Sequence, residues 1–256
     1  MDLQLKNKIA LITGASKGIG FACAMRLATE GCHVRLVSRT KTDLKEAQEK
    51  IRQQSNVDVQ ISPCDLSKGD SVRELMGNNN DIDILINNAG AIPNGFIDEI
   101  DEDTWRQAWD LKVFGYINSC REAFAFMKAR KQGVIINIIG AGGERHTPNY
   151  IVGGTGNAAL MALSRDLGSN SLKFGVRVIG LNPGMIKTER LEYLMRRRAK
   201  HKFNDENRWQ ELFDPDLPPG EPENIADMVA LLSSDLSSFT SGTIISVDGG
   251  ASARFG

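Results

Sequence analysis

The stretch Thr13-Gly14-Ala15-Ser16-Lys17-Gly18-Ile19-Gly20 decides the fold of this chain. The apolar run 9–12 before it predicts a buried strand, and the apolar-rich segment 21–28 after it predicts a helix. Glycines let the backbone turn tightly and approach a ligand, because they carry no Cβ. Such a turn points free N–H groups at a helix N-terminus, where an anion is stabilised. The stretch is therefore typical of a βαβ unit that holds a dinucleotide pyrophosphate.

Short runs rich in Val and Ile alternate with helical patterns along the rest of the chain. We expect strands at 9–13, 34–37, 57–61, 82–87, 134–139, 176–181 and 243–247. We expect helices near 18–30, 41–54, 68–78, 102–130, 153–173 and 222–233. Continuously apolar strands are typical of a parallel sheet that is buried on both faces. The pattern predicts one doubly wound α/β domain of Rossmann type over residues 1–256, with about seven strands, helices on both faces and right-handed crossovers.

The bulk composition is that of an ordinary globular protein. The formal net charge of −1 gives no global field for nucleic acid or an anionic membrane. No apolar run is long enough to span a bilayer, and the first eight residues contain no signal-peptide core. The four cysteines are scattered and show no metal-ligand spacing. We therefore expect a cytoplasmic protein that acts on a small molecule, with no metal, nucleic-acid or membrane partner.

Four later elements extend the pattern of the glycine turn: Asp65-Leu66, Asn87-Asn88-Ala89-Gly90, Asn182-Pro183-Gly184 with Thr188, and Val247-Asp248-Gly249-Gly250. Together with the turn they resemble the short-chain dehydrogenase/reductase family over nearly the whole chain. The resemblance implies a lid over the substrate around 185–220. It also implies a homo-oligomer, a dimer or tetramer, formed through the helices near 102–130 and 153–173. The cofactor contacts that it implies are Gly14, Ser16, Lys17, Gly18, Ile19, Gly20, Ser38, Arg39, Asp65, Leu66, Asn88, Ala89, Gly90, Asn157, Pro183, Gly184, Ile186 and Thr188.

Charge after the second strand favours NADP(H) over NAD(H). Members of the family that bind NAD carry an acid there, which holds the ribose 2′-hydroxyl. This chain has Ser38, which does not repel a 2′-phosphate, and then Arg39, which can pair with one in a bidentate manner. Lys17 in the glycine turn resembles the second basic residue of NADP-preferring members.

The chain departs from its family at the residues that perform the chemistry. The usual Asn, Ser, Tyr and Lys fall here on Lys112, Gly140, Gly153 and Asn157. Other registers put the Asn on Asp110 or the Ser on Ile139, and no lysine between 131 and 173 restores a Tyr-x-x-x-Lys pattern. Lys112 and Asn157 therefore suggest an exchanged pair, with the ammonium at one position and the amide at the other.

Tyr150 is a candidate general acid, because it precedes Gly153 by one helical turn and Asn157 by two. The sequence predicts an oxidoreductase that transfers a hydride between NADP(H) and a carbonyl or alcohol, with Tyr150, Lys112 and Asn157 as non-standard acid/base residues. A lyase or epimerase on the same fold, or a non-catalytic NADP(H)-binding protein, is the alternative. We interpret the basic run at 196–202 as a solvated helix face.

Overall fold

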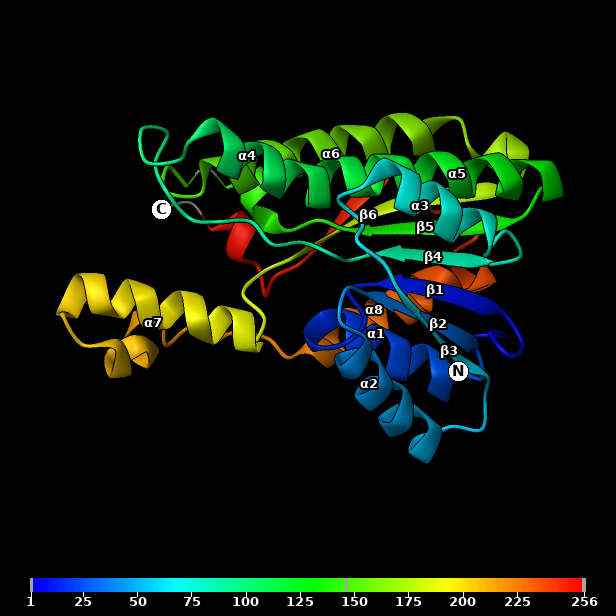
Figure 1. Ribbon diagram of the computed structural model, residues 1–256, viewed down its shortest axis with the longest axis horizontal. Coiled ribbons are helices and arrows are strands. Elements are labelled where there is room, and N and C mark those ends of the chain that lie inside the picture. The colour runs from blue at the N-terminus through cyan, green and yellow to red at the C-terminus, as the bar shows by residue number, and fades with distance from the viewer. Residues whose placement is uncertain (1, 146, 255–256) are drawn as a thin grey trace.

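A parallel sheet of seven strands forms the centre of the computed structural model, which describes residues 2–145 and 147–254 (Figure 1). Its strands are β1 (Ile9–Thr13), β2 (His33–Ser38), β3 (Val59–Pro63), β4 (Ile84–Asn87), β5 (Gly133–Ile138), β6 (Val176–Pro183) and β7 (Thr243–Val247). Their order is β3-β2-β1-β4-β5-β6-β7, and every neighbouring pair is parallel. The expected Rossmann-type sheet is confirmed, although β3 and β4 each begin two residues later than predicted.

Helices cover both faces of the sheet (Figure 1). One face carries α1 (Gly18–Thr29), α2 (Lys41–Gln54) and α8 (Pro222–Ser233). The other carries α3 (Gly69–Gly77), α5 (Gly115–Arg130) and α6 (Ile151–Ser169), with α4 (Glu102–Trp109) at one end. A separate apolar cluster fills each interface: Leu27, Leu44 and Val229 belong to the first, and Val72, Ala123 and Met127 to the second. The buried strands are mostly apolar because both of their faces are covered; Asn87, Asn137 and Arg177 are among their few buried polar residues.

The connection from β6 to β7 corrects the expectation that all crossovers are right-handed. The chain moves one way across the sheet from β1 to β2 and the opposite way from β6 to β7. Nevertheless α8 lies beside α1 on the same face (Figure 1). The two connections therefore have opposite hands. The β6–β7 connection is long, because it contains two further helices, so the preference that governs short crossovers does not constrain it.

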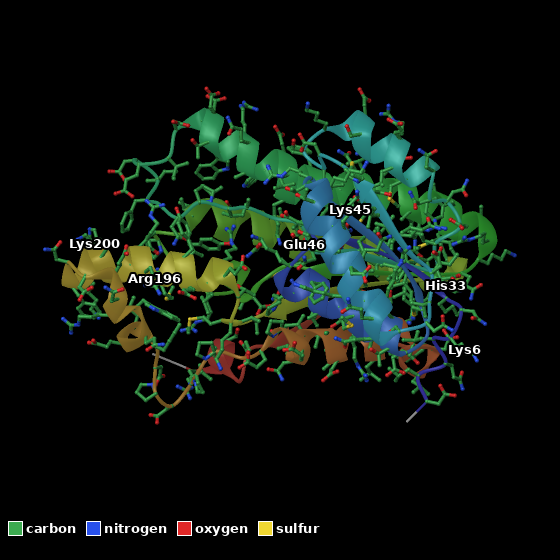
Figure 2. The ribbon with its side chains drawn as sticks, turned by 60° about the horizontal axis from the view of Figure 1, so that its bottom comes forward. Lys6, His33, Lys45, Glu46, Arg196 and Lys200 are labelled. Carbon is green, nitrogen blue, oxygen red and sulfur yellow. The ribbon has the colours of Figure 1, made fainter. Side chains whose placement is uncertain are left out.

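The lid segment 185–220 is more regular than the sequence suggests. It consists mainly of α7 (Glu189–Phe203) and the 3₁₀ segment η4 (Glu206–Leu212), which lie against each other and project beyond the sheet (Figure 1). Thr188 caps α7 by accepting a hydrogen bond from the Leu191 N–H. Figure 2 shows Arg196 and Lys200 on α7, and Arg196 pairs with Glu192 at 2.8 Å. The basic run is therefore a solvated helix face, as predicted.

Candidate active site and cofactor cleft

The glycine turn joins β1 to α1 in a conformation that only glycine adopts easily. Gly14 and Gly18 have φ values of +64° and +57°, in the left-handed region. A Cβ on Gly20 would lie 2.3 Å from the Gly14 carbonyl oxygen, so the first turn of α1 passes directly against the loop. Figure 2 shows Lys45 and Glu46 on α2, the helix that covers the same face of the sheet as α1. The turn thus exposes the N-terminus of α1 at the carboxyl edge of the sheet, where an anion is stabilised.

The end of β4 is fastened to the end of β1 at the point where strand order reverses. The Asn88 side-chain amide donates to the carbonyls of Thr13 (3.1 Å) and Gly14 (3.2 Å). In return, the Thr13 hydroxyl accepts from the backbone N–H groups of Asn88 (2.9 Å) and Ala89 (3.1 Å). These bonds fix the floor of the crevice in which open α/β sheets bind nucleotides.

A cleft of about 920 Å³ opens at this edge and is bordered by the first turn of α7. Twelve of the predicted cofactor residues line it: Gly14, Ser16, Lys17, Gly18, Ile19, Ser38, Arg39, Leu66, Asn88, Ala89, Gly90 and Thr188. The residues that line it and that sequence reasoning missed are Thr40, Asp43, Cys64, Ala91, Leu111, Lys187, Glu189, Arg190 and Tyr193. The missed residues either flank a motif or belong to the lid, which has no motif.

The other predicted cofactor residues do not line this cleft. Gly20 lies under the turn, and the Asp65 carboxylate accepts hydrogen bonds from Ser67, which hold the pKa of Asp65 below its usual value. Pro183 ends β6 and is buried, and Gly184 approaches Asp248 so closely that a Cβ would lie 2.8 Å from its Cα. Ile186 is buried and pairs with Gly220. These residues shape the cleft without forming its surface.

Polar groups at the β2 end of the cleft suit a phosphate. The Ser38 hydroxyl is buried and has no hydrogen-bond partner among the described residues. Arg39 follows it on the cleft wall, and within the described residues no carboxylate pairs with this guanidinium. Lys17 pairs with Glu189 of α7 at 3.0 Å, so an ion pair links the glycine turn to the lid. A phosphoryl group bound here would accept a hydrogen bond from the buried Ser38 hydroxyl and would pair with the Arg39 guanidinium.

Lys112 lies in a single π-helical turn, Asp110–Phe114, between α4 and α5. Its stem passes under Gly90, where a Cβ would lie 2.8 Å from Lys112 Cδ. The ammonium donates to the carbonyls of Ile138 (3.0 Å) and Ile139 (3.2 Å) and to the Tyr116 hydroxyl (3.1 Å). Burial, and secondarily the charge of Arg190, lower its pKa to about 7. A π-turn within an α-helix often marks a functional site.

Asn157 approaches the same strand end from α6. Its amide donates to the Gly140 carbonyl at 3.3 Å, while its carbonyl oxygen is buried without a partner in the described part of the chain. Gly140 has a φ of +128°, which a serine there would not tolerate without strain. The structure thus brings Lys112 and Asn157 to consecutive carbonyls after β5, although no hydrogen bond joins the two side chains among the described residues.

Tyr150 is the N-cap residue of α6, and its ring folds back over the first turn of that helix. A Cβ on Gly153 would lie 2.0 Å from Tyr150 Cζ and 2.5 Å from its hydroxyl oxygen. A Cβ on Gly142 would lie 3.0 Å from the same ring. Tyr150 therefore occupies the space into which a side chain at position 153 would project. Burial raises the pKa of Tyr150, and the positive charge of Arg190 opposes this increase.

Comparison with known proteins identifies the family. A family model described as short chain dehydrogenase matches residues 8–199. This chain belongs to the short chain dehydrogenase family. It is 31% identical over 258 aligned residues to the 3-oxoacyl-acyl-carrier-protein reductase of Chlamydia trachomatis, covering 98% of this chain and 99% of that protein. It is 32% identical over 253 residues to the 2-keto-3-deoxy-L-fuconate dehydrogenase of Xanthomonas campestris, covering 97% and 81%.

Solved structures agree with this assignment to the short chain dehydrogenase family. The L-sorbose reductase of Gluconobacter frateurii, crystallised with NADPH and L-sorbose, has a TM-score of 0.91 and 28% identity over the whole of both chains. The protein is accordingly an NAD(P)-dependent oxidoreductase with a Rossmann-type nucleotide-binding fold. In the part of the chain that the structure describes, no helix is long and apolar enough to cross a membrane.

Proposed function

We propose that this protein is an NADP(H)-dependent oxidoreductase that interconverts a small-molecule carbonyl and its alcohol, with Tyr150 as the general acid. The placement of the Tyr150 ring over Gly153 carries the proposal. A phenol delivered from one turn earlier takes the space of the tyrosine of the family pattern, which this chain replaces with Gly153. Because burial raises its pKa, Tyr150 stays protonated at neutral pH and is ready to donate a proton.

The cofactor preference is supported by the β2 end of the cleft. Ser38 and Arg39 suit a 2′-phosphate, and Lys17 provides a second cation once it exchanges Glu189 for the phosphate. When it is bound, the nicotinamide supplies the hydride that adds to the substrate carbon. The Tyr150 hydroxyl gives its proton to the substrate oxygen, which yields the alcohol.

Lys112 and Asn157 act in this proposal as positioning residues. They hold three consecutive carbonyls after β5, at residues 138–140, and so fix the loop that borders Tyr150 through Gly142. Arg190 favours the phenolate that forms after proton transfer, because its charge lowers the pKa of Tyr150. The proposed proton transfer from Tyr150 therefore requires no carboxylate side chain.

A binding assay followed by a turnover assay tests the function. We expect NADPH to bind, with a fluorescence change, and to be oxidised in the presence of members of a carbonyl panel. The variant Tyr150→Phe should lose at least tenfold in kcat while its Kd for NADPH changes less than twofold. Unchanged kcat in this variant would remove Tyr150 from the chemistry, and absence of NADPH binding would contradict the cofactor assignment.

The second candidate is a protein that binds NADP(H) without transferring a hydride, or that uses it in a lyase or epimerase reaction. One observation favours it: all three donors of the Lys112 ammonium bind acceptors within the protein rather than groups in the cleft. NADPH binding without oxidation of NADPH by any carbonyl would support this candidate.

We also infer a reducing, cytoplasmic environment, because the four cysteines are free thiols.

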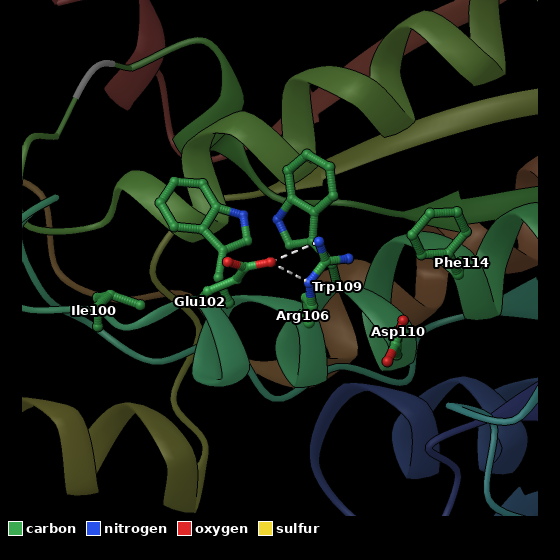
Figure 3. Close-up of a pocket in the computed structure, with 7 residues that line it drawn as sticks. Ile100, Glu102, Arg106, Trp109, Asp110 and Phe114 are labelled. Carbon is green, nitrogen blue, oxygen red and sulfur yellow. Dashed lines mark hydrogen bonds and ion pairs between the residues drawn. The ribbon is translucent and has the colours of Figure 1, made fainter.

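We further propose that the protein forms a homo-oligomer, a dimer or tetramer, through the face that carries α4 and α5. A hollow of about 430 Å³ on this face is lined by Trp105, Trp109 and the ion pair Glu102–Arg106. Figure 3 shows Trp109 beside this ion pair. Phe114 at its edge is 49% exposed, and a contact with a second subunit would bury this apolar ring. Light scattering on the wild type should give a multiple of 28.1 kDa, and Phe114→Glu should lower it. A wild-type monomer would contradict the proposal.

A further inference from the structure

Arg190 connects the cofactor cleft to the residues around Tyr150. It is the second residue of α7 and lines the same cleft as the glycine turn. Its Nη2 donates to the Ile92 carbonyl at 2.6 Å, which fastens α7 to the loop after Asn88-Ala89-Gly90. This single bond orients the guanidinium. It leaves the Nε and Nη1 groups without a hydrogen-bond partner among the described residues, although the side chain is exposed to the cleft.

Arg190 also differs in its charge environment from the cations around it. Three cations of the turn and the lid have carboxylate partners, in the pairs Lys17–Glu189, Lys187–Glu221 and Arg196–Glu192, whereas Arg39 at the other end of the cleft has none among the described residues. Within residues 2–145 and 147–254, no carboxylate oxygen lies within 4.0 Å of Arg190. An arginine in a cleft that has free donors and no counter-charge is ready to bind an anion.

The position of Arg190 points to the substrate rather than to the adenosine part of the cofactor. Arg190 contacts the carbonyl of Ile92, and Ile92 belongs to the buried apolar cluster against which Tyr150 packs; the charge of Arg190 also lowers the pKa of Tyr150. The residues at the other end, Ser38 and Arg39, follow β2. The contact with Ile92 therefore places Arg190 on the side of the cleft toward Tyr150. Any anion held by Arg190 lies near the group that we expect to transfer the proton.

We propose that Arg190 binds a carboxylate of the substrate, so that the substrate is an oxo acid or the corresponding hydroxy acid. This inference rests on the proposed function, because it places the substrate carbonyl at Tyr150. The free edge of a guanidinium forms two parallel hydrogen bonds with a carboxylate, which fixes the orientation of a small molecule as well as its affinity. A cofactor phosphate is the other anion that offers the same chemistry, and the experiment separates the two sources.

The test compares oxo acids with neutral diketones of the same shape. The pairs are acetoacetate with 2,4-pentanedione and pyruvate with 2,3-butanedione, each assayed with NADPH in the wild type, in Arg190→Gln and in the matched control Arg198→Gln. Arg198 is an exposed residue of the same helix and does not line the cleft. We expect kcat/KM of the wild type to favour the acid by at least tenfold. Arg190→Gln should reduce this ratio at least 30-fold, whereas the control should keep it.

A second measurement makes the inference independent of turnover. Calorimetry measures acetoacetate binding to the protein saturated with NADP⁺, and separately NADPH binding to the free protein. The inference predicts that Arg190→Gln weakens acetoacetate binding at least tenfold and changes the Kd for NADPH less than threefold. A tenfold loss of NADPH affinity with an unchanged acid-to-diketone ratio would overturn it and assign Arg190 to a cofactor phosphate. Lost acetoacetate binding in the variant, with no turnover by any protein, would support the anion site and contradict the proposed oxidoreductase.

Discussion

The buried lysine in the π-turn makes the stability of this protein depend on pH in a predictable direction. The pKa of Lys112 in the folded protein is about 7, compared with an ordinary value of 10.5. Between these values the unfolded chain holds a proton that the folded chain has released. The free energy of unfolding therefore rises with pH across this window, by up to about 1.4 kcal/mol for each pH unit.

The perturbation that isolates this effect is Lys112→Met, which replaces the lysine stem with an unbranched apolar side chain one atom shorter and removes the titration. From pH 7.5 to 9.5 the stability of the wild type relative to this variant should increase by about 2 kcal/mol. The variant also leaves the Ile139 carbonyl without a donor among the described residues, which costs about 1 to 3 kcal/mol at every pH and adds a constant offset.

Urea denaturation at pH 7.5, 8.5 and 9.5 measures the difference, because the other titrating groups are common to both proteins. Lys45→Met, at an exposed position of α2, is the matched control and should show no such slope. A flat difference between wild type and Lys112→Met would refute the reasoning. It would show that the three acceptors around Nζ, which match the three N–H groups of an ammonium, keep Lys112 charged throughout the range.

Five further substitutions test the cleft and the site. Gly20→Ala should lower the free energy of unfolding by about 3 kcal/mol in urea denaturation, because its Cβ would lie 2.3 Å from the Gly14 carbonyl oxygen. The comparison variant Gly77→Ala, in open space within α3, should raise the free energy of unfolding by about 0.5 kcal/mol. Lys17→Met should raise the Kd for NADPH about tenfold and that for NADH less than threefold in fluorescence titrations, whereas Glu189→Gln should lower the Kd for NADPH about twofold by releasing Lys17. Gly153→Ala should displace the Tyr150 ring and reduce kcat at least tenfold in the NADPH assay, with unchanged NADPH binding.

The sequence was sufficient for the sheet and for most of the cleft, because both depend on local patterns. Strands buried on two faces are mostly apolar, and the turn after β1 requires glycine at Gly14 and Gly18 whatever the rest of the chain does. The prediction of a right-handed β6–β7 connection was wrong, because its hand follows from the contact of α8 with α1. This contact pairs segments about 200 residues apart in the chain.

The features of the site that the sequence could not give share one property: no periodic pattern or motif determines them. Arg190 reaches the cleft because Thr188 starts α7 there and the Ile92 carbonyl receives its guanidinium. Tyr150 was correctly placed one turn before Gly153, but as an N-cap residue its ring direction follows from the loop that precedes it. The three acceptors of Lys112 belong to β5 and α5, so only the folded chain shows where its donors go.

The glycines at the site are better explained as one coordinated repacking than as separate losses. Gly153 and Gly142 are both required by the same Tyr150 ring, and Gly140 by its positive φ and by Asn157 Nδ2, which would lie 3.2 Å from an added Cβ. A site that had simply lost its function would leave space at these positions, whereas here a named side chain fills each one. Restoring a tyrosine by Gly153→Tyr alone should therefore lower stability and yield no activity, because Tyr150 already occupies the place of its ring.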